Sequence, residues 1–209
     1  MAKVKMSKKS TSIDMTAMCD VAFLLLTFFI LTATAKQPEP LEVQTPSSTV
    51  QTKLPDTDLA TITIGKDKDG KDKVFFGVIG KEVRIKTLEF MGQEYGLEFN
   101  DEQKQRFSVI DGFGTSMETL PSLIALKGSE RTHSELQTGI PMDSLNNQLS
   151  KWIMSARKAN IELYDKELRF AIKGDAKEEY PSIKKIMDIL QDQKINSFNL
   201  VTGLRGENY

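Results

Sequence analysis

The chain has 209 residues, a formal net charge of −1 and 39% hydrophobic residues, which is typical of one folded domain of ordinary size or two small ones. The near-zero charge gives no excess of basic side chains, so we expect no nucleic-acid partner. A single cysteine (Cys19) excludes an intrachain disulfide, and a single histidine (His133) excludes a histidine-rich metal site. Because the sequence also lacks the nucleophile and histidine pattern of a hydrolase, we expect neither enzymatic activity nor a cofactor.

The N-terminal segment has the pattern of a membrane-spanning helix. Four lysines and no acidic residue lie within the first nine residues, and residues 15–35 then contain no lysine or arginine. A helix over residues 15–35 would span about 31 Å, which matches the hydrocarbon thickness of a bilayer. The lysines before the span predict that residues 1–14 lie in the cytoplasm and that the rest of the chain lies on the outer side of the membrane. We therefore expect a single-pass membrane protein.

A secretory signal peptide is the alternative interpretation of the same segment. The basic start, the apolar core and Ala33-Thr34-Ala35, which fits an A-x-A cleavage site, satisfy the signal-peptide pattern as well. Asp20 favours the membrane helix, because a carboxylate gives no advantage to a segment that is removed. In a membrane helix a carboxylate costs about 2.5–3.5 kcal/mol near the bilayer centre, so a retained one indicates a function.

Asp20 belongs to a narrow polar stripe along the predicted helix. At about 100° per residue, four polar side chains lie within roughly 40° of one another, namely Thr16, Asp20, Thr27 and Thr34. Asp14 lies on the opposite side, near the cytoplasmic boundary. Lipid is a poor solvent for the stripe, so we expect it to pack against protein or to line a wet cavity. Asp20 is the predicted proton-handling residue, with Thr16 and Thr27 in support; alternatively, the threonines bond only their own helix backbone.

The region after the helix predicts a linker and then a hairpin. Residues 36–58 contain four prolines among serines and threonines, which indicates an extended linker, with Leu41–Gln44 as a candidate short strand. Leu59–Ile64 and Val74–Ile79 have strand patterns, and Asp69-Gly70 between them predicts a hairpin turn. A calcium site in this acidic turn is excluded, because an EF-hand loop needs another ligand before the glycine and a glutamate at position twelve.

Residues 81–141 are a predicted insertion before the next regular elements. Five aromatic side chains indicate that this segment is folded, namely Phe90, Tyr95, Phe99, Phe107 and Phe113. We expect a helix over residues 115–127. Asp111–Gly114 is expected to be a turn, since the lysine and the strand–helix context of a nucleotide-binding loop are missing. The sequence assigns no role to this region.

The remainder of the chain alternates between helix and strand patterns. Asp143 is the predicted cap of a helix over residues 143–158. A strand at Leu168–Ile172, a helix with Pro181 in its first turn and a strand at Phe198–Thr202 follow. Strand, helix and strand in this order predict a parallel pair joined by a crossover helix.

The N-terminal residues resemble the membrane signature of the ExbD/TolR family. That signature reads Asn-x-Thr-Pro-x-x-Asp and continues into a leucine-rich run, and residues 13–29 follow the same pattern. Asp20 falls on the essential aspartate of the family, and Thr16 falls on its threonine. Asp14 and Ala17 depart from the pattern, because they stand where the family usually has Asn and Pro.

The C-terminal residues 168–202 resemble the last strand, helix and strand of the same family. The resemblance implies an α+β protein of the inner membrane with a single N-terminal transmembrane helix and a small periplasmic domain. Residues 59–209 would form this domain, with element order β-β-α-β-α-β, two helices on one face of the sheet, and residues 81–141 inserted.

Membership of this family implies a proton-channel or motor subunit that is not an enzyme. The expected partners are an ExbB-like polytopic membrane protein that rings two copies of the helix, a TonB-like protein, and a second copy of the chain in a homodimer. Such a complex uses the proton motive force to energise TonB-dependent transport across the outer membrane. A TolR-like or gliding-stator subunit and a secreted or anchored periplasmic binding module remain the alternatives.

Overall fold

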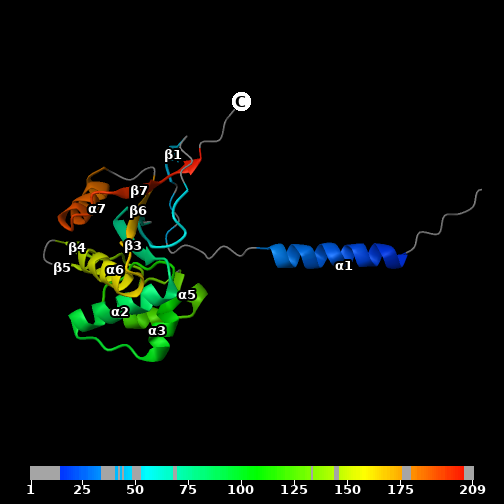
Figure 1. Cartoon of the computed structure of the whole chain (residues 1–209), viewed down its shortest axis with the longest axis horizontal. Helices are drawn as coiled ribbons and strands as arrows, with labels where there is room; N and C mark the ends of the chain where they lie inside the picture. Colours follow the sequence, from blue (N-terminus) through cyan, green and yellow to red (C-terminus); the bar gives the residue numbers. More distant parts are fainter. Residues whose placement is uncertain are drawn as a thin grey trace, which may run out of the picture. The chain divides into compact units, whose positions relative to one another are not determined.

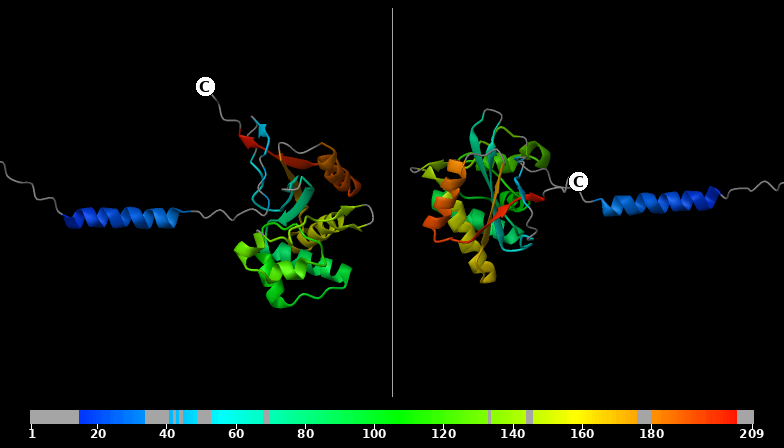
Figure 2. Two further views of the ribbon diagram at one scale, coloured as in Figure 1. Left: turned by 180° about the vertical axis from the view of Figure 1, so that it is seen from behind. Right: turned by 90° about the horizontal axis from the view of Figure 1, so that it is seen from above.

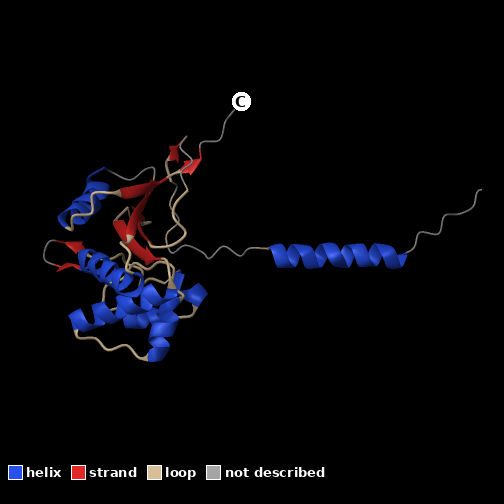
Figure 3. Cartoon of the chain, viewed as in Figure 1, coloured by secondary structure: helices blue, strands red, loops and turns tan. Residues whose placement is uncertain are grey.

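The computed structural model describes residues 15–33, 41, 43, 45–48, 53–67, 70–132, 134–143, 146–175 and 180–204. They belong to two compact units, residues 1–37 and residues 38–209. In its described part the first unit consists of helix α1 (Met15–Thr32), drawn in blue in Figure 1. The second unit is a mixed domain of sheet and helices (Figure 3), which confirms the predicted α+β class.

The central sheet of the domain has four strands in the order β3-β2-β6-β7. They are β2 (Leu59–Lys66), β3 (Asp72–Val78), β6 (Arg169–Gly174) and β7 (Phe198–Val201). β2 pairs antiparallel with β3 and parallel with β6, and β7 pairs parallel with β6. The predicted hairpin and the predicted parallel C-terminal pair are both confirmed.

The turn of the β2–β3 hairpin is built around Gly70. This residue has a φ of 73°, which favours glycine, and its N–H donates to the carbonyl oxygen of Asp67 at 2.8 Å. The Asp67 carboxylate pairs with Lys73 Nζ at 2.7 Å. Asp67 therefore serves the hairpin, while Asp69, the other half of the predicted turn pair, lies outside the described residues.

Two helices cover one face of the sheet (Figure 2), α6 (Gln148–Tyr164) and α7 (Tyr180–Asp192). This face is apolar because Ile62 of β2 lies opposite Phe76 of β3 and Ile172 of β6. Ile186 and Leu190 of α7 are fully buried. The predicted arrangement of two helices on one face is therefore confirmed, with Pro181 in the first turn of α7.

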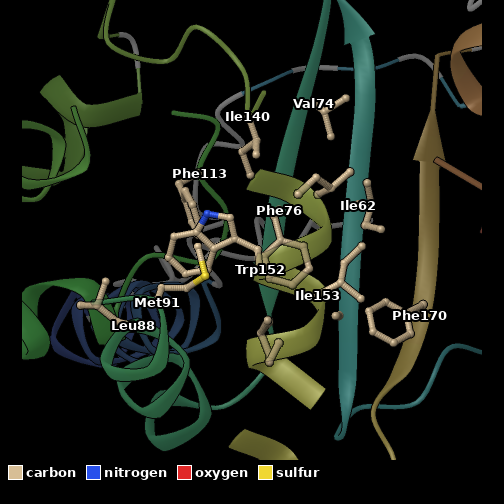
Figure 4. Close-up of a cluster of buried hydrophobic side chains, with 14 of the residues drawn as sticks. Ile62, Val74, Phe76, Leu88, Met91, Phe113, Ile140, Trp152, Ile153 and Phe170 are labelled. Atoms are coloured by element: carbon tan, nitrogen blue, oxygen red, sulfur yellow. The ribbon is translucent and has the colours of Figure 1, made fainter. Parts of the chain in front are cut away.

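An aromatic cluster around Trp152 lies at the centre of the core (Figure 4). The Trp152 ring centroid is 6.5 Å from that of Phe76, 6.1 Å from that of Phe107 and 4.8 Å from that of Phe113. Phe107 and Phe113 belong to residues 81–141, so this segment packs into the same core as the sheet. Burial of such large rings contributes strongly to folding.

Helix α6 begins at Gln148 and not at the predicted Asp143. The residues before it form a small antiparallel pair, β4 (Met142–Asp143) and β5 (Asn146–Asn147). The Asn147 side chain is the true cap, since its Oδ1 accepts from the Ser150 N–H at 3.0 Å. The helix also continues past residue 158, to Tyr164.

Residues 81–141 are folded, as their aromatic content predicts. Their described part contains four helices, α2 (Lys81–Tyr95), α3 (Asp101–Ser108), α4 (Leu120–Ala125) and α5 (Gly128–Thr132). The predicted helix over residues 115–127 is shorter, because hydroxyl groups hold its first residues in a turn: Thr119 Oγ1 lies 2.5 Å from Thr115 Oγ1 and 3.2 Å from Ser116 Oγ. The predicted turn at Asp111–Gly114 instead includes Phe113 paired with Phe76 of β3.

Part of the predicted linker lies on the domain. Strand β1 (Ser47–Ser48) pairs parallel with β8 (Gly203–Leu204). Leu41 and Val43 lie over Gly65, where an added Cβ would be 2.8 Å from Val43 Cγ1 and 2.9 Å from Leu41 Cδ2. The candidate strand Leu41–Gln44 is wrong for its described residues, because neither Leu41 nor Val43 lies in a strand.

We predict that Trp152→Ala destabilises the domain by about 3–5 kcal/mol, because it leaves a cavity where four aromatic rings meet. Met154→Ala on the same helix is the matched control, since Met154 is 45% exposed, and it should cost about 0.5 kcal/mol or less. Urea unfolding, monitored by circular dichroism, measures the free energy of unfolding of both variants. Equal stability of the two variants would contradict the placement of Trp152 in the core.

Candidate functional site

Helix α1 leaves its apolar surface uncovered by the described residues of its own unit. In the described part of the chain it is the one helix long and apolar enough to cross a membrane. None of its residues is buried, and eleven large apolar side chains are exposed. At 1.5 Å per residue its 18 residues span about 27 Å. Water is a poor solvent for such a surface, so the helix needs lipid or protein around it.

Asp20 is the acidic residue of this helix in the described range. It lies in the second turn, about 7.5 Å along the axis from Met15. Its side chain is exposed, and within the described residues no hydrogen bond or ion pair engages its carboxylate. A charge that has no partner in its own chain must find water, a proton or a group of another chain when lipid surrounds the helix.

The threonines of the stripe have different surroundings. Thr27 Oγ1 donates to the carbonyl oxygen of Leu24 at 2.9 Å, so its proton already serves the helix backbone. Thr32, off the stripe, makes the same kind of bond to Phe28 at 2.8 Å. Thr16 lies one helical turn before Asp20. Thr34 lies outside the described residues.

The helix therefore brings Thr16, Asp20 and Thr27 to one face, because they are four and seven residues apart in continuous helix. Thr27 can accept a hydrogen bond through its free lone pair, although it donates to Leu24. The role of these three residues in proton transfer stays a prediction. The chemistry available here is reversible protonation of one carboxyl group.

A polar contact holds the chain where it enters the sheet of the domain. Asp58 has a φ of 55°, and its carbonyl oxygen accepts from the Arg169 N–H at 2.8 Å. Asn160, which is fully buried, donates through Nδ2 to Asp58 Oδ1 at 3.3 Å and to the Lys166 carbonyl oxygen at 2.9 Å. These bonds join the start of β2 to the end of α6 and the start of β6.

Tyr164 lies near this contact, at the end of α6. Its hydroxyl donates to Glu82 Oε2 at 3.3 Å, which joins α6 to the start of α2. Desolvation, and then the charge of Glu82, raise the pKa of the Tyr164 phenol. The tyrosine therefore stays neutral and remains a hydrogen-bond donor at physiological pH.

Sequence reasoning missed a second polar contact, which is made by Arg84. Its guanidinium donates to the Val78 carbonyl oxygen at 2.6 Å, to the Ser108 carbonyl oxygen at 2.9 Å and to Asp111 Oδ1 at 2.7 Å. An arginine in an amphipathic helix has no local signal that separates it from a surface residue. Val78 lies just before the helix, but Ser108 and Asp111 lie 24 and 27 residues further along the chain, so only the folded structure identifies the contact.

The aspartates of the hairpin do not gather into a metal site. Asp67 is paired with Lys73, and the Asp72 carboxylate accepts a short hydrogen bond from Ser182 Oγ. Within the described residues no group of three or more acidic, histidine or cysteine side chains is placed to hold a metal ion. The acidic residues of this region therefore have structural partners in α7 and β3.

A comparison with protein-family models matches residues 6–204 to a family described as biopolymer transport protein ExbD/TolR. No curated protein and no solved structure matches the chain. The family match takes in α1 with Asp20 as well as the sheet and helices of the domain, and it covers nearly the whole chain.

The match agrees with the geometry of both units. It includes a helix that is apolar enough to cross a membrane and an α+β domain that follows it. The chain therefore belongs to the ExbD/TolR family of biopolymer transport proteins, whose members are energy-transduction subunits of membrane complexes.

Proposed function

We propose that this chain is a proton-channel or motor subunit that works with an ExbB-like partner. The pair uses the proton motive force to energise TonB-dependent transport across the outer membrane. The observation that carries the proposal is the Asp20 carboxylate, which lies on an apolar helix and has no partner among the described residues of the chain. A single ionisable group at membrane depth is by default a candidate for carrying protons.

The cost of placing a carboxylate in a membrane helix and the energy released by one proton that crosses the membrane are of similar size. A carboxylate costs about 2.5–3.5 kcal/mol at the centre of a membrane helix, and less nearer the interface. One proton that crosses the membrane releases about 2.3 kcal/mol per 100 mV. Low-dielectric surroundings favour the neutral form of a carboxyl group, so Asp20 takes up a proton when it turns away from water. Protonation therefore changes which surroundings the helix prefers.

The polar stripe of α1 supports a partner protein around the helix. Lipid can cover leucine and phenylalanine, but the Asp20 carboxylate on this stripe needs polar neighbours or water. A ring of an ExbB-like protein around two copies of α1 supplies both, and a homodimer then places two Asp20 carboxyls inside one ring. Proton uptake on one side and release on the other turns the helix pair against the ring.

The lysines before α1 favour a cytoplasmic N-terminus, and the domain then lies in the periplasm. Movement of α1 reaches the domain through residues 33–58, which lead into β2 beside the Asp58–Asn160 contact. From the domain this movement passes to a TonB-like protein.

A TolR-like or gliding-stator subunit would use the same Asp20 chemistry but would act on a different partner protein. The identity of the membrane protein that co-purifies with the chain separates these cases.

We predict that Asp20→Asn keeps assembly with the partner but reduces energy-dependent transport to the background level, because the amide cannot carry a proton. Asp14→Asn is the matched control, since the helical period of the sequence predicts that Asp14 lies away from the stripe, and its transport should remain near that of the native chain. Co-purification of the partner measures assembly. Uptake of a transported substrate with and without an uncoupler measures energy-dependent transport. Full transport by Asp20→Asn would end the proposal.

We predict that Thr27→Val lowers transport severalfold, while Thr32→Val leaves it unchanged. Both threonines bond their own backbone at similar distances, 2.9 Å and 2.8 Å. Only Thr27 shares the stripe with Asp20, so only its loss removes a polar group from the proton path. The same uptake measurement applies, and equal effects of the two substitutions would argue against a role for the stripe.

We predict that the mature chain keeps residues 1–35. The family match begins at residue 6 and takes in the apolar segment, which supports a membrane anchor over a cleaved signal peptide. Mass spectrometry of the protein purified from membranes measures its N-terminus. A mature chain that begins at Lys36 would favour a secreted binding module and would remove Asp20 from the protein.

A further inference from the structure

The two edges of the central sheet have different surroundings. In a sheet of order β3-β2-β6-β7, the outer sides of β3 and β7 are the places where another strand can add. An uncovered edge presents unpaired N–H and C=O groups to any neighbouring chain. The fate of these two edges therefore decides how copies of this domain can pair.

Backbone groups from residues 81–141 occupy the outer side of β3. The Phe76 N–H donates to the Phe113 carbonyl oxygen at 2.8 Å, and the Phe113 N–H donates back at 3.0 Å. The Ile140 N–H donates to the Val74 carbonyl oxygen at 2.8 Å. Further along the strand, Arg84 Nε donates to the Val78 carbonyl oxygen at 2.6 Å. Three separate parts of one segment thus take up the outward hydrogen-bonding groups of β3.

Glycines allow this close approach. A Cβ on Gly77 would lie 2.1 Å from the Asp111 carbonyl oxygen, and a Cβ on Gly114 would lie 2.6 Å from the Phe75 ring. Gly139, with a φ of 95°, would place a Cβ 3.2 Å from the Val74 nitrogen. Larger side chains at these positions would push residues 111–114 and 139 away from β3.

The covering residues are held firmly on the edge. Phe113 is buried and its ring lies 4.8 Å from that of Trp152, so the cover shares the core of the domain. The Gly139 N–H donates to the Gly114 carbonyl oxygen at 2.8 Å, which ties the two covering stretches together. Arg84 adds bonds to Ser108 and Asp111 on the approach to Phe113.

The β7 edge is different. β6 is the one strand that pairs with β7 in the described sheet. Leu200 in β7 is 61% exposed, whereas Ile172, its partner in β6, is buried. Beyond Thr202 the chain continues into β8, which pairs with β1, so the described residues leave only the outer side of β7 itself without a strand.

We propose that residues 81–141 act as an edge cover: they close β3 to other chains and leave β7 as the one edge of this sheet at which a strand can add. The consequence is a limit on assembly. Pairing of β3 with β7 between copies would be head-to-tail, and such contacts add further copies into rings or open filaments. Pairing through β7 alone stops at two copies. Tethering copies side by side in a membrane raises their local concentration and makes such a limit necessary.

This inference rests on the sheet and not on Asp20, so the two proposals can fail separately. The test uses the full chain in detergent, with Gly77→Val to displace the cover and Arg84→Met as a milder variant in case Gly77→Val does not fold. Gly128→Val is the matched control, because no atom lies within 4 Å of a Cβ at that position. Hydrogen exchange reports the Phe76 amide, and sedimentation reports particle size against concentration.

In the native chain and in Gly128→Val, we expect a protected Phe76 amide and no particle larger than two copies. Displacing the cover should raise the exchange rate of Phe76 at least about tenfold, because its hydrogen bond to Phe113 is lost, and should give larger particles that grow with concentration. Adding Leu200→Lys to either variant should return the particles to two copies or fewer, because a lysine discourages pairing at the β7 edge.

Three results would overturn the proposal. Phe76 could exchange rapidly in the variants while the particle size stays native. The larger particles could persist after Leu200→Lys, which would indicate aggregation of unfolded chain. Phe76 could also stay protected in both variants, which would mean that the contacts of Gly77 and Arg84 do not hold the cover.

Discussion

The proposed function depends on one electrostatic constraint, an acidic side chain on a helix that is otherwise suited to lipid. Asp20 has no partner among the described residues, and the helix around it exposes eleven large apolar side chains. Charge and hydrocarbon are incompatible unless the carboxyl is neutral or another molecule supplies polar groups. When lipid surrounds the helix, Asp20 therefore needs a proton, water or polar groups of another molecule, and the family match gives this need a setting in energy transduction.

The domain that follows is a stable body on which such a helix can act. Its sheet and its two helices enclose the Trp152 cluster, and residues 81–141 add Phe107 and Phe113 to the same core. Asp58 and Asn160 fix the point at which the chain enters β2, and β1 contacts the domain earlier in the chain, through β8. Rigid packing transmits displacement, since a close-packed interior deforms little.

Features with a short sequence period could be predicted, and features that join distant segments could not. The strand alternation of residues 59–64 and the helical spacing of α7 depend on local pattern, and both are confirmed. The start of α6 was misplaced because Asp143 and Asn147 are equally good caps, and the β4–β5 pair decides between them. Asp20 is visible in sequence because a carboxylate is rare within an apolar run. The cover over β3 leaves no such signal, because its bonds join residues from separate parts of the chain.

Infrared spectroscopy of the purified membrane complex tests the central claim most directly, because it observes the carboxyl group itself. The account predicts a carbonyl band of a protonated carboxylic acid that is absent from the Asp20→Asn complex and whose intensity follows pH reversibly. The same band should persist in the Asp14→Asn complex. A complex that is intact and active, yet shows identical spectra for the native chain and Asp20→Asn at every pH, would contradict the account.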